Sequence, residues 1–339
     1  MTRARRFRGW ATFAALLLLG ASLAQPTLSL PRGFFRYVLV FDITQSMNVA
    51  DQGTAAAPLT RLAAAKHTAR RMLDRLPCDS EIGLALFTEH RSLLLFAPVE
   101  VCAHYTEINA VLNTIDWRLA WRSRSEIAKG LISAIDLNAK LARPGRVVLF
   151  TDGHEAPPIH PEFRQHPTPV VANQRGVIVG IGGDDPRPIP KFDHNGLPIG
   201  FWQPEDLEQV DVFSRGRDLT GEAMTGVDMS DLAARIQRGT EHLSALHEDY
   251  LRALAREAGF AYHRLRDPDD AARYLRRAEF AERRTAATDL GPYLAGAAML
   301  LLLASYAAPL ARFATPRVVR NAARAVEHPA RDTPNGKGA

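Results

Sequence analysis

Three short apolar runs in the chain each end in a cluster of polar residues. The runs cover residues 37–41, 146–150 and 177–181. Runs of this kind are typical of strands that helices cover on both sides. Helical spacing of apolar residues appears between the runs, over residues 59–76, 105–115 and 127–141. The alternation predicts an α/β fold with a doubly wound, mostly parallel sheet, in which ligands bind at the carboxyl edge of the strands.

A β-hairpin is predicted between the first two helical patterns. Residues 81–97 form two β runs around a polar turn at Thr88 to Ser92. Folding this hairpin about residue 90 places Cys78 opposite Cys102, so the geometry allows a disulfide at its open end. The alternative is two separate buried thiols.

The pattern becomes irregular over an insert at about residues 184–247. Several prolines surround Asn195-Gly196, which predicts a hairpin turning at that dipeptide. Residues 228–254 are typical of one or two helices. Gly259 then ends a helix, and a final strand follows it.

Both ends of the chain carry long uncharged runs beside arginines. No charged residue lies between Arg8 and Arg32, and Ser22-Leu23-Ala24 resembles a signal-peptidase site. Residues 1–31 therefore predict either a cleaved signal peptide or an uncleaved membrane anchor. The run within residues 289–311 predicts a transmembrane helix with Tyr293 and Tyr306 near its ends, and the alternative is a buried C-terminal helix.

The net charge of +5 comes from the two ends, because residues 10–311 are slightly acidic. The basic residues therefore indicate membrane topology and not nucleic-acid binding. By the positive-inside rule, the basic tail at 312–339 lies in the cytoplasm. Residues 32–285 are then expected in the periplasm, where disulfides form.

Hydroxyl and carboxylate side chains follow two of the predicted strands. Asp42, Thr44 and Ser46 come directly after the first run, and Asp152 in Thr151-Asp152-Gly153 follows the second. Oxygen ligands of this kind suit Mg²⁺, with Ca²⁺ or Mn²⁺ as alternatives. Such residues also cap helices, so either motif alone is weak evidence.

Together these residues resemble the metal-ion-dependent adhesion site (MIDAS) of von Willebrand factor A (VWA) domains. The resemblance covers about residues 36–267 and implies that the 81–97 hairpin supplies an antiparallel edge strand. It implies a metal site of Asp42, Thr44, Ser46, Ser125 and Asp152. Ser125 stands where the family usually has Thr, and Ser123 is a second choice for that ligand. An open metal position would be completed by a carboxylate of a protein partner.

Four segments are similar to segments of bacterial inner-membrane VWA proteins of the Bat group, which are associated with MoxR ATPases. They are Met47 through Asp51, Arg61-Leu-x-x-Ala-Lys66, Leu76-Pro-x-Asp79 and Gly83-Leu-x-x-Phe87. VWA proteins of similar layout (the MxaC and MxaL type) serve in methanol dehydrogenase maturation. The resemblance implies an accessory factor and not an enzyme. Such a factor is expected to act in assembly or maturation of an envelope enzyme, with methanol dehydrogenase as the leading hypothesis. The alternative is a Bat-like role in envelope stress or aerotolerance, with a MoxR ATPase or other VWA membrane subunits as partners.

Two competing hypotheses use the same residues differently. A metal-dependent hydrolase would need a general base beside the metal, and His154 is the nearest candidate in the sequence. A purely structural role would need no metal at all.

Overall fold

The computed structural model describes residues 2–120, 124–157, 159, 164–170, 175–206 and 241–313 of the 339. The chain divides into two compact units. One is Gly33–Arg284, and the other combines Met1–Arg32 with Thr285–Ala339.

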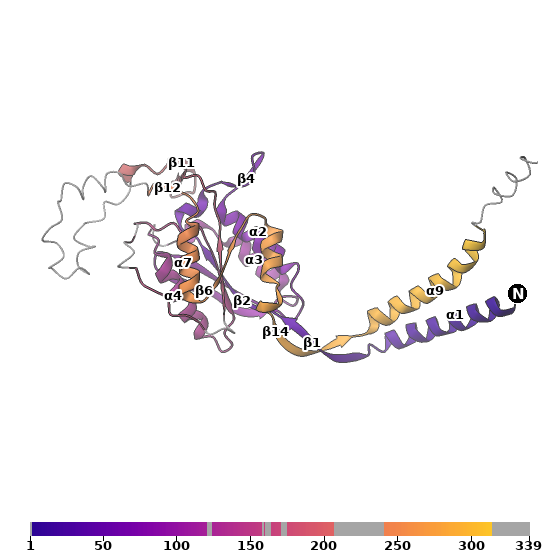
Figure 1. Ribbon diagram of the computed structural model, residues 1–339. Coiled ribbons are helices and arrows are strands. Elements are labelled where there is room, and N and C mark those ends of the chain that lie inside the picture. Colours follow the sequence, from indigo (N-terminus) through magenta and orange to yellow (C-terminus); the bar gives the residue numbers. More distant parts are fainter. Residues whose placement is uncertain are drawn as a thin grey trace, which may run out of the picture. The chain divides into compact units, whose positions relative to one another are not determined.

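A six-stranded sheet forms the centre of the Gly33–Arg284 unit (Figure 1). Its order is β13-β8-β7-β2-β5-β6, and every neighbouring pair is parallel except β5 with β6. The predicted α/β fold, with a mostly parallel sheet and one antiparallel edge strand, is therefore confirmed. The strands are β2 (Arg36–Asp42), β5 (Glu81–Thr88), β6 (Arg91–Glu100), β7 (Arg146–Thr151), β8 (Val177–Gly180) and β13 (Ala261–Arg264).

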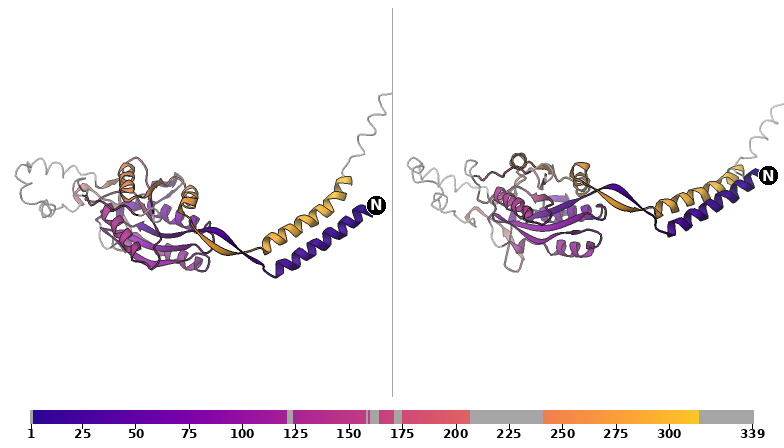
Figure 2. Two further views of the ribbon diagram at one scale, coloured as in Figure 1. Left: turned by 60° about the horizontal axis from the view of Figure 1, so that its bottom comes forward. Right: turned by 90° about the horizontal axis from the view of Figure 1, so that it is seen from below.

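Helices cover both faces of this sheet (Figures 1 and 2). Alternate residues of β2 point to opposite faces, so Leu39 joins one buried cluster and Val40 joins the other. The first cluster includes residues of α2 (Arg61–Leu73), α3 (Tyr105–Thr114) and α8 (Pro268–Leu275). The second includes residues of α4 (Ile127–Ala139) and α7 (Glu248–Ala258). The three predicted helical patterns at 59–76, 105–115 and 127–141 correspond to α2, α3 and α4.

The described part of the insert consists of short paired strands. The predicted hairpin is present, with Asn195 and Gly196 in its turn and Gly196 at a φ of +82°. Residues 228–240 of the predicted helical stretch lie outside the described residues, and α7 begins only at Glu248. The pairs in the insert are β9 (Arg187–Pro188) with β12 (Leu243–Ser244), and β10 (Pro190–Phe192) with β11 (Pro198–Phe201). A further small pair, β3 (Gln52–Thr54) with β4 (Ala57–Leu59), lies outside the insert, before α2.

Short 3₁₀ turns complete the elements of this unit. They are η1 (Gln45–Asn48), η2 (Trp117–Leu119), η5 (Pro204–Asp206) and η6 (Ala278–Phe280). Gly259 ends α7 at a φ of +69°, and the final strand β13 follows, as the sequence predicts.

The second unit contains two long helices that lie side by side (Figure 2). They are α1 (Thr2–Leu23) and α9 (Gly291–Phe313). Small side chains are buried on both helices, among them Ala15 and Ala298. β1 (Thr27–Phe34) and β14 (Glu282–Asp289) pair in a two-stranded sheet.

Membrane-spanning or signal segments are predicted at both ends of the chain, where α1 and α9 lie. Over the described residues, neither α1 nor α9 combines the length and the apolar character that crossing a membrane requires. In α1 the reason is visible, because its first turns contain Arg3, Arg5, Arg6 and Arg8. Only Gly9–Leu23 remain uncharged, which is about 22 Å of helix against about 30 Å of hydrocarbon. Residues 314–339, most of the basic tail, lie outside the described residues.

Candidate metal-binding site

The first part of the site is the loop after β2. Asp42 ends that strand, and its Oδ1 accepts hydrogen bonds from the Thr44 backbone N–H (2.9 Å) and the Thr44 hydroxyl (2.7 Å). Ser46 is the second residue of η1, and its Oγ lies 3.3 Å from Thr44 Oγ1. The loop therefore gathers one carboxylate and two hydroxyls.

The second part is the loop after β7, the strand beside β2. The Thr151 hydroxyl donates to Asp42 Oδ2 at 2.7 Å and so joins the two loops. Gly153 adopts a φ of +76°, which turns the chain so that the His154 N–H donates to Asp152 Oδ1 at 3.0 Å. The Ser46 side chain also helps to lower the pKa of Asp152. The parallel sheet thus brings Asp42, Thr44, Ser46 and Asp152 together, as expected for strand ends at one edge.

Ser125 lies just before α4 and is held by backbone hydrogen bonds. Its N–H donates to the Ala156 carbonyl, and its own carbonyl accepts from Ala156 N–H. The side chain is 1% exposed, and no described group hydrogen-bonds to its Oγ. Ser123, the second choice for this ligand, lies outside the described residues.

The two carboxylates have opposite electrostatic environments. Burial and the negative charge of Asp152 raise the pKa of Asp42, although the Thr151 and Thr44 hydrogen bonds oppose this. Burial alone would also raise the pKa of Asp152. The charge of Arg61 and the hydrogen bond from the His154 backbone N–H outweigh burial and hold that pKa below its usual value.

An arginine that the sequence analysis did not assign to the site contacts Asp152. Arg61 is the first residue of α2 and is 0% exposed. Its Nη1 lies 2.5 Å from Asp152 Oδ2, and its Nη2 lies 2.6 Å from Asp51 Oδ2. The only signal in the sequence was the Asp51 and Arg61 motif, which supported the subgroup resemblance but no site role.

The end of the insert also contributes to the site. Ser244 in β12 donates its hydroxyl to Asp152 Oδ2 at 3.0 Å, and its carbonyl accepts from Arg61 Nη2 at 3.0 Å. The His247 N–H donates to the Asp152 carbonyl at 2.9 Å. Nothing in the local sequence around Ser244 indicated this role, because the contact depends on a long return of the chain.

Comparison with known families identifies the domain that carries these loops. A family model described as von Willebrand factor type A domain matches residues 37–154. This segment includes Asp42, Thr44, Ser46, Ser125 and Asp152. Residues 37–154 thus match a VWA domain.

Similar proteins were found by sequence and by structure. A UPF0353 protein of Mycolicibacterium paratuberculosis is 28% identical over 58% of this chain and 55% of its own length. Another, from Mycobacterium sp. strain KMS, is 29% identical over 65% of this chain and 64% of its own length. The chain therefore aligns with little more than half of these curated relatives.

Two solved structures from Bacteroides are also similar. An aerotolerance-related membrane protein of B. fragilis has 17% identity and a TM-score of 0.44, covering 71% of this chain and 96% of that one. The conserved hypothetical protein BatB of B. thetaiotaomicron has 15% identity and a TM-score of 0.43, covering 71% and 95%.

The donor set of the VWA domain fits a hard divalent cation. Asp42 and Asp152 already accept hydrogen bonds on both of their carboxylate oxygens. They are therefore better placed to attract a cation by their negative charge than to bind it directly. The hydroxyls of Thr44, Ser46 and Ser125 are the available oxygen ligands. A buried hydroxyl without a partner is costly, and a bound cation would satisfy Ser125 Oγ.

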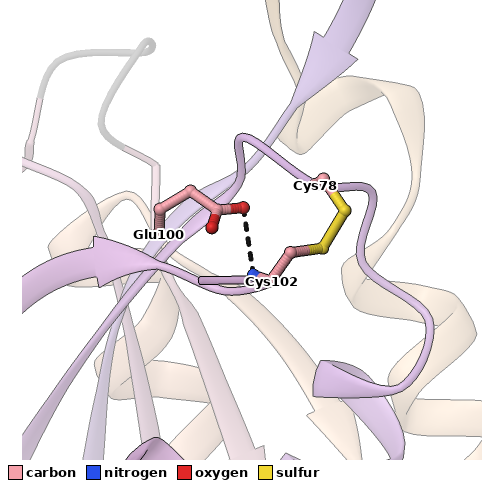
Figure 3. Close-up of side chains that lie close together, drawn as sticks. All are labelled: Cys78, Glu100 and Cys102. Atoms are coloured by element: carbon pink, nitrogen blue, oxygen red, sulfur yellow. Dashed lines mark hydrogen bonds between the residues drawn. A yellow bond between two sulfur atoms is a disulfide. The ribbon is translucent and has the colours of Figure 1, made fainter. Parts of the chain in front are cut away.

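Another group of potential metal ligands, Cys78, Glu100 and Cys102, is tied up in structural contacts (Figure 3). The two cysteines form a disulfide, which confirms that the hairpin geometry allows the bridge. Glu100 accepts backbone hydrogen bonds from Asp79, Cys102 and Ala103. This cluster closes the open end of the β5–β6 hairpin and leaves no thiolate for a metal.

Proposed function

We propose that the VWA domain binds a protein partner through a divalent cation, Mg²⁺ in the first place, with Ca²⁺ or Mn²⁺ as alternatives. Two observations carry this proposal. The strand ends after β2 and β7 gather two hydroxyls and two carboxylates, and the buried, unpartnered hydroxyl of Ser125 lies on a segment whose backbone pairs with Ala156 in the loop after β7. Three neutral hydroxyl ligands leave coordination positions and positive charge on the cation. A carboxylate of the partner supplies both a ligand and the missing negative charge.

For the biological setting, we propose a Bat-like accessory role with a MoxR-type ATPase, ahead of methanol dehydrogenase maturation. The support is that two of the four segments similar to Bat proteins contain Asp51 and Arg61, whose side chains form an ion pair at the site. We place the domain in an oxidising compartment, the periplasm, because the Cys78–Cys102 disulfide persists in such compartments.

Binding, and not catalysis, is proposed as the activity. One observation favours the hydrolase hypothesis enough to test it: His154 is buried, and its Nε2 has no partner among the described residues. Burial lowers the pKa of His154, which favours the uncharged ring that a general base requires. If His154→Ala abolishes function in cells while metal and partner binding persist, the binding proposal is wrong.

The direct test measures cation binding and capture of partners together. The purified chain should bind Mg²⁺ or Mn²⁺ in isothermal titration calorimetry, and Asp42→Ala should abolish the signal. Cross-linking in cells should then yield partner adducts that EDTA and Asp42→Ala both remove. Asp136→Ala is a matched control, because that carboxylate is exposed on α4. Adducts that persist in Asp42→Ala would instead support a metal-free structural role.

A further inference from the structure

Arg61 is held inside the site by groups from four separate segments of the chain. Its Nε and Nη2 contact Asp51, and its Nη1 contacts Asp152 and the Ser244 hydroxyl, the last at 2.6 Å. Nη2 also donates to the Ser244 carbonyl, and Nη1 lies 3.5 Å from the Ser46 carbonyl. A guanidinium has five N–H donors in a fixed plane, and this arrangement uses all three of its nitrogens.

The guanidinium has no contact with solvent, so its charge depends on these two carboxylates for compensation. Asp51 is 7% exposed and Asp152 is 0% exposed. Low solvent access keeps the interactions between these charges strong, and it does the same for any cation that enters beside them. The Asp51–Arg61–Asp152 group is therefore part of the electrostatics of the metal site.

Arg61 also determines what Asp152 can offer to a metal. Its Nη1 and the Ser244 hydroxyl both contact Asp152 Oδ2, while Oδ1 accepts from the His154 N–H. Direct ligation by Oδ2 would require the guanidinium to move away. With Arg61 in place, the negative charge of Asp152 is already partly compensated by the guanidinium.

We infer that Arg61 is a positioning residue that weakens cation binding at this site, and that Asp51 moderates the effect by sharing the guanidinium. The inference rests on the proposed metal site. Arg61 provides a permanent positive charge with which a divalent ion must compete for Asp152. Asp51 draws part of that charge toward itself, since it contacts both Nε and Nη2.

This arrangement has a consequence for the partner. A cation held weakly by the chain alone gains most from an additional anionic ligand. The partner's carboxylate and the cation should therefore bind cooperatively, with each increasing the affinity of the other by the same factor. Arg61 thereby makes loading of the metal dependent on the partner.

Substitutions of the two residues should change cation affinity in opposite directions. Arg61→Met removes the competing positive charge and should tighten Mg²⁺ binding about tenfold. Asp51→Asn leaves the charge of Arg61 without its second carboxylate and should weaken Mg²⁺ binding about tenfold. A merely structural role predicts weaker binding for both variants. Calorimetry with Mg²⁺ and electron paramagnetic resonance with Mn²⁺, both on the purified 339-residue chain, provide the affinities.

Folding must be controlled because Arg61→Met leaves two buried carboxylates without their cation. The double variant Asp51→Asn/Arg61→Met removes one charge of each sign and should bind Mg²⁺ with nearly wild-type affinity. Arg71→Met is the matched control on the same helix, because Arg71 is part-exposed and pairs with Asp269. It should leave cation affinity unchanged.

Thermal unfolding adds a readout that does not depend on partner binding. Mg²⁺ should raise the unfolding temperature of Arg61→Met more than that of the wild type, because the ion replaces the lost positive charge. Equal or weaker Mg²⁺ binding by a folded Arg61→Met, or a double variant that binds Mg²⁺ as weakly as Asp51→Asn, would overturn the inference while leaving the proposed function intact. If no variant and no wild-type chain binds a cation, the proposed function fails as well.

Discussion

Asp42 and Asp152 follow neighbouring parallel strands and are equally buried, yet their surroundings differ in one respect. Asp42 receives hydrogen bonds from Thr44 and Thr151, which are neutral groups. Asp152 receives similar bonds and also contacts the Arg61 guanidinium. The pKa of Asp42 is consequently raised and that of Asp152 is lowered.

The difference indicates which carboxylate lacks a cation. Asp152 has one within the fold, so its negative charge is stable without metal. Asp42 has hydroxyl neighbours that can ligate a metal and no positive side chain in direct contact among the described residues. A divalent ion would therefore relieve Asp42 more than Asp152.

Asp152→Asn should have the largest effect on the metal-free chain. It leaves the Arg61 guanidinium buried with Asp51 as its remaining carboxylate, and breaking a buried pair in this way costs about 3–5 kcal/mol. Urea unfolding in EDTA measures the loss. A loss below about 1 kcal/mol would mean that Arg61 does not depend on Asp152, and the comparison would fail.

Asp42→Asn should have a smaller effect of the opposite sign. An amide keeps the size of the carboxylate but removes a buried negative charge, so the metal-free chain should gain about 1 kcal/mol at pH 8. The same variant should no longer bind Mg²⁺. A loss of stability comparable to that of Asp152→Asn would show that the two carboxylates are held alike.

The sequence was sufficient to predict the sheet and the gathering of Asp42, Thr44, Ser46 and Asp152 at one edge of it. The buried runs of β2 and β7 are continuous in sequence, and their polar ends hold Asp42 and Asp152. Parallel pairing then places both ends at one edge without further information. Ser125 was also found in advance, through its family pattern, although its orphan hydroxyl was not foreseeable.

Arg61 and Ser244 could not be assigned from the sequence for physical reasons. An arginine at the start of a helix is usually solvated, and only the three-dimensional arrangement shows that Asp51 and Asp152 remove it from water. Ser244 reaches Asp152 across a sequence separation of 92 residues. The uncharged run after Arg8 likewise does not show where a helix lies, since α1 extends over the arginines and ends at Leu23.

Acid should weaken cation binding at a higher pH than is usual for a carboxylate site. The ionised form of Asp42 attracts the cation, and its raised pKa means that protonation begins well above the usual range near 4. Without metal, Asp42 favours folding at pH below its unfolded value, and that contribution is lost as pH rises through its raised pKa. Asp152 behaves oppositely, with its contribution lost as pH falls through its lowered pKa.

Calorimetric titrations with Mg²⁺ at several pH values, from about 5 to about 8, give the cation affinity as a function of pH. Asp51→Asn should shift the profile little, because that residue contacts Arg61 and not Asp42. A flat profile over this range would show that Asp42 stays ionised throughout, which would remove the contrast with Asp152.

Ser125→Ala should produce the smallest change in stability and thereby tests the third hydroxyl. Its Oγ has no partner among the described residues, so removing it should alter the free energy of unfolding in EDTA by less than about 0.5 kcal/mol. Mg²⁺ affinity should nevertheless fall several-fold, because a ligand is lost. Ser125→Thr keeps the hydroxyl and adds a methyl that restricts its rotamer, so its affinity should match or exceed that of the wild type. If Ser125→Ala binds Mg²⁺ with wild-type affinity, the cation is held by the Asp42 loop alone. The two strand ends would then differ in the ligands that they supply as well as in the charge around their carboxylates.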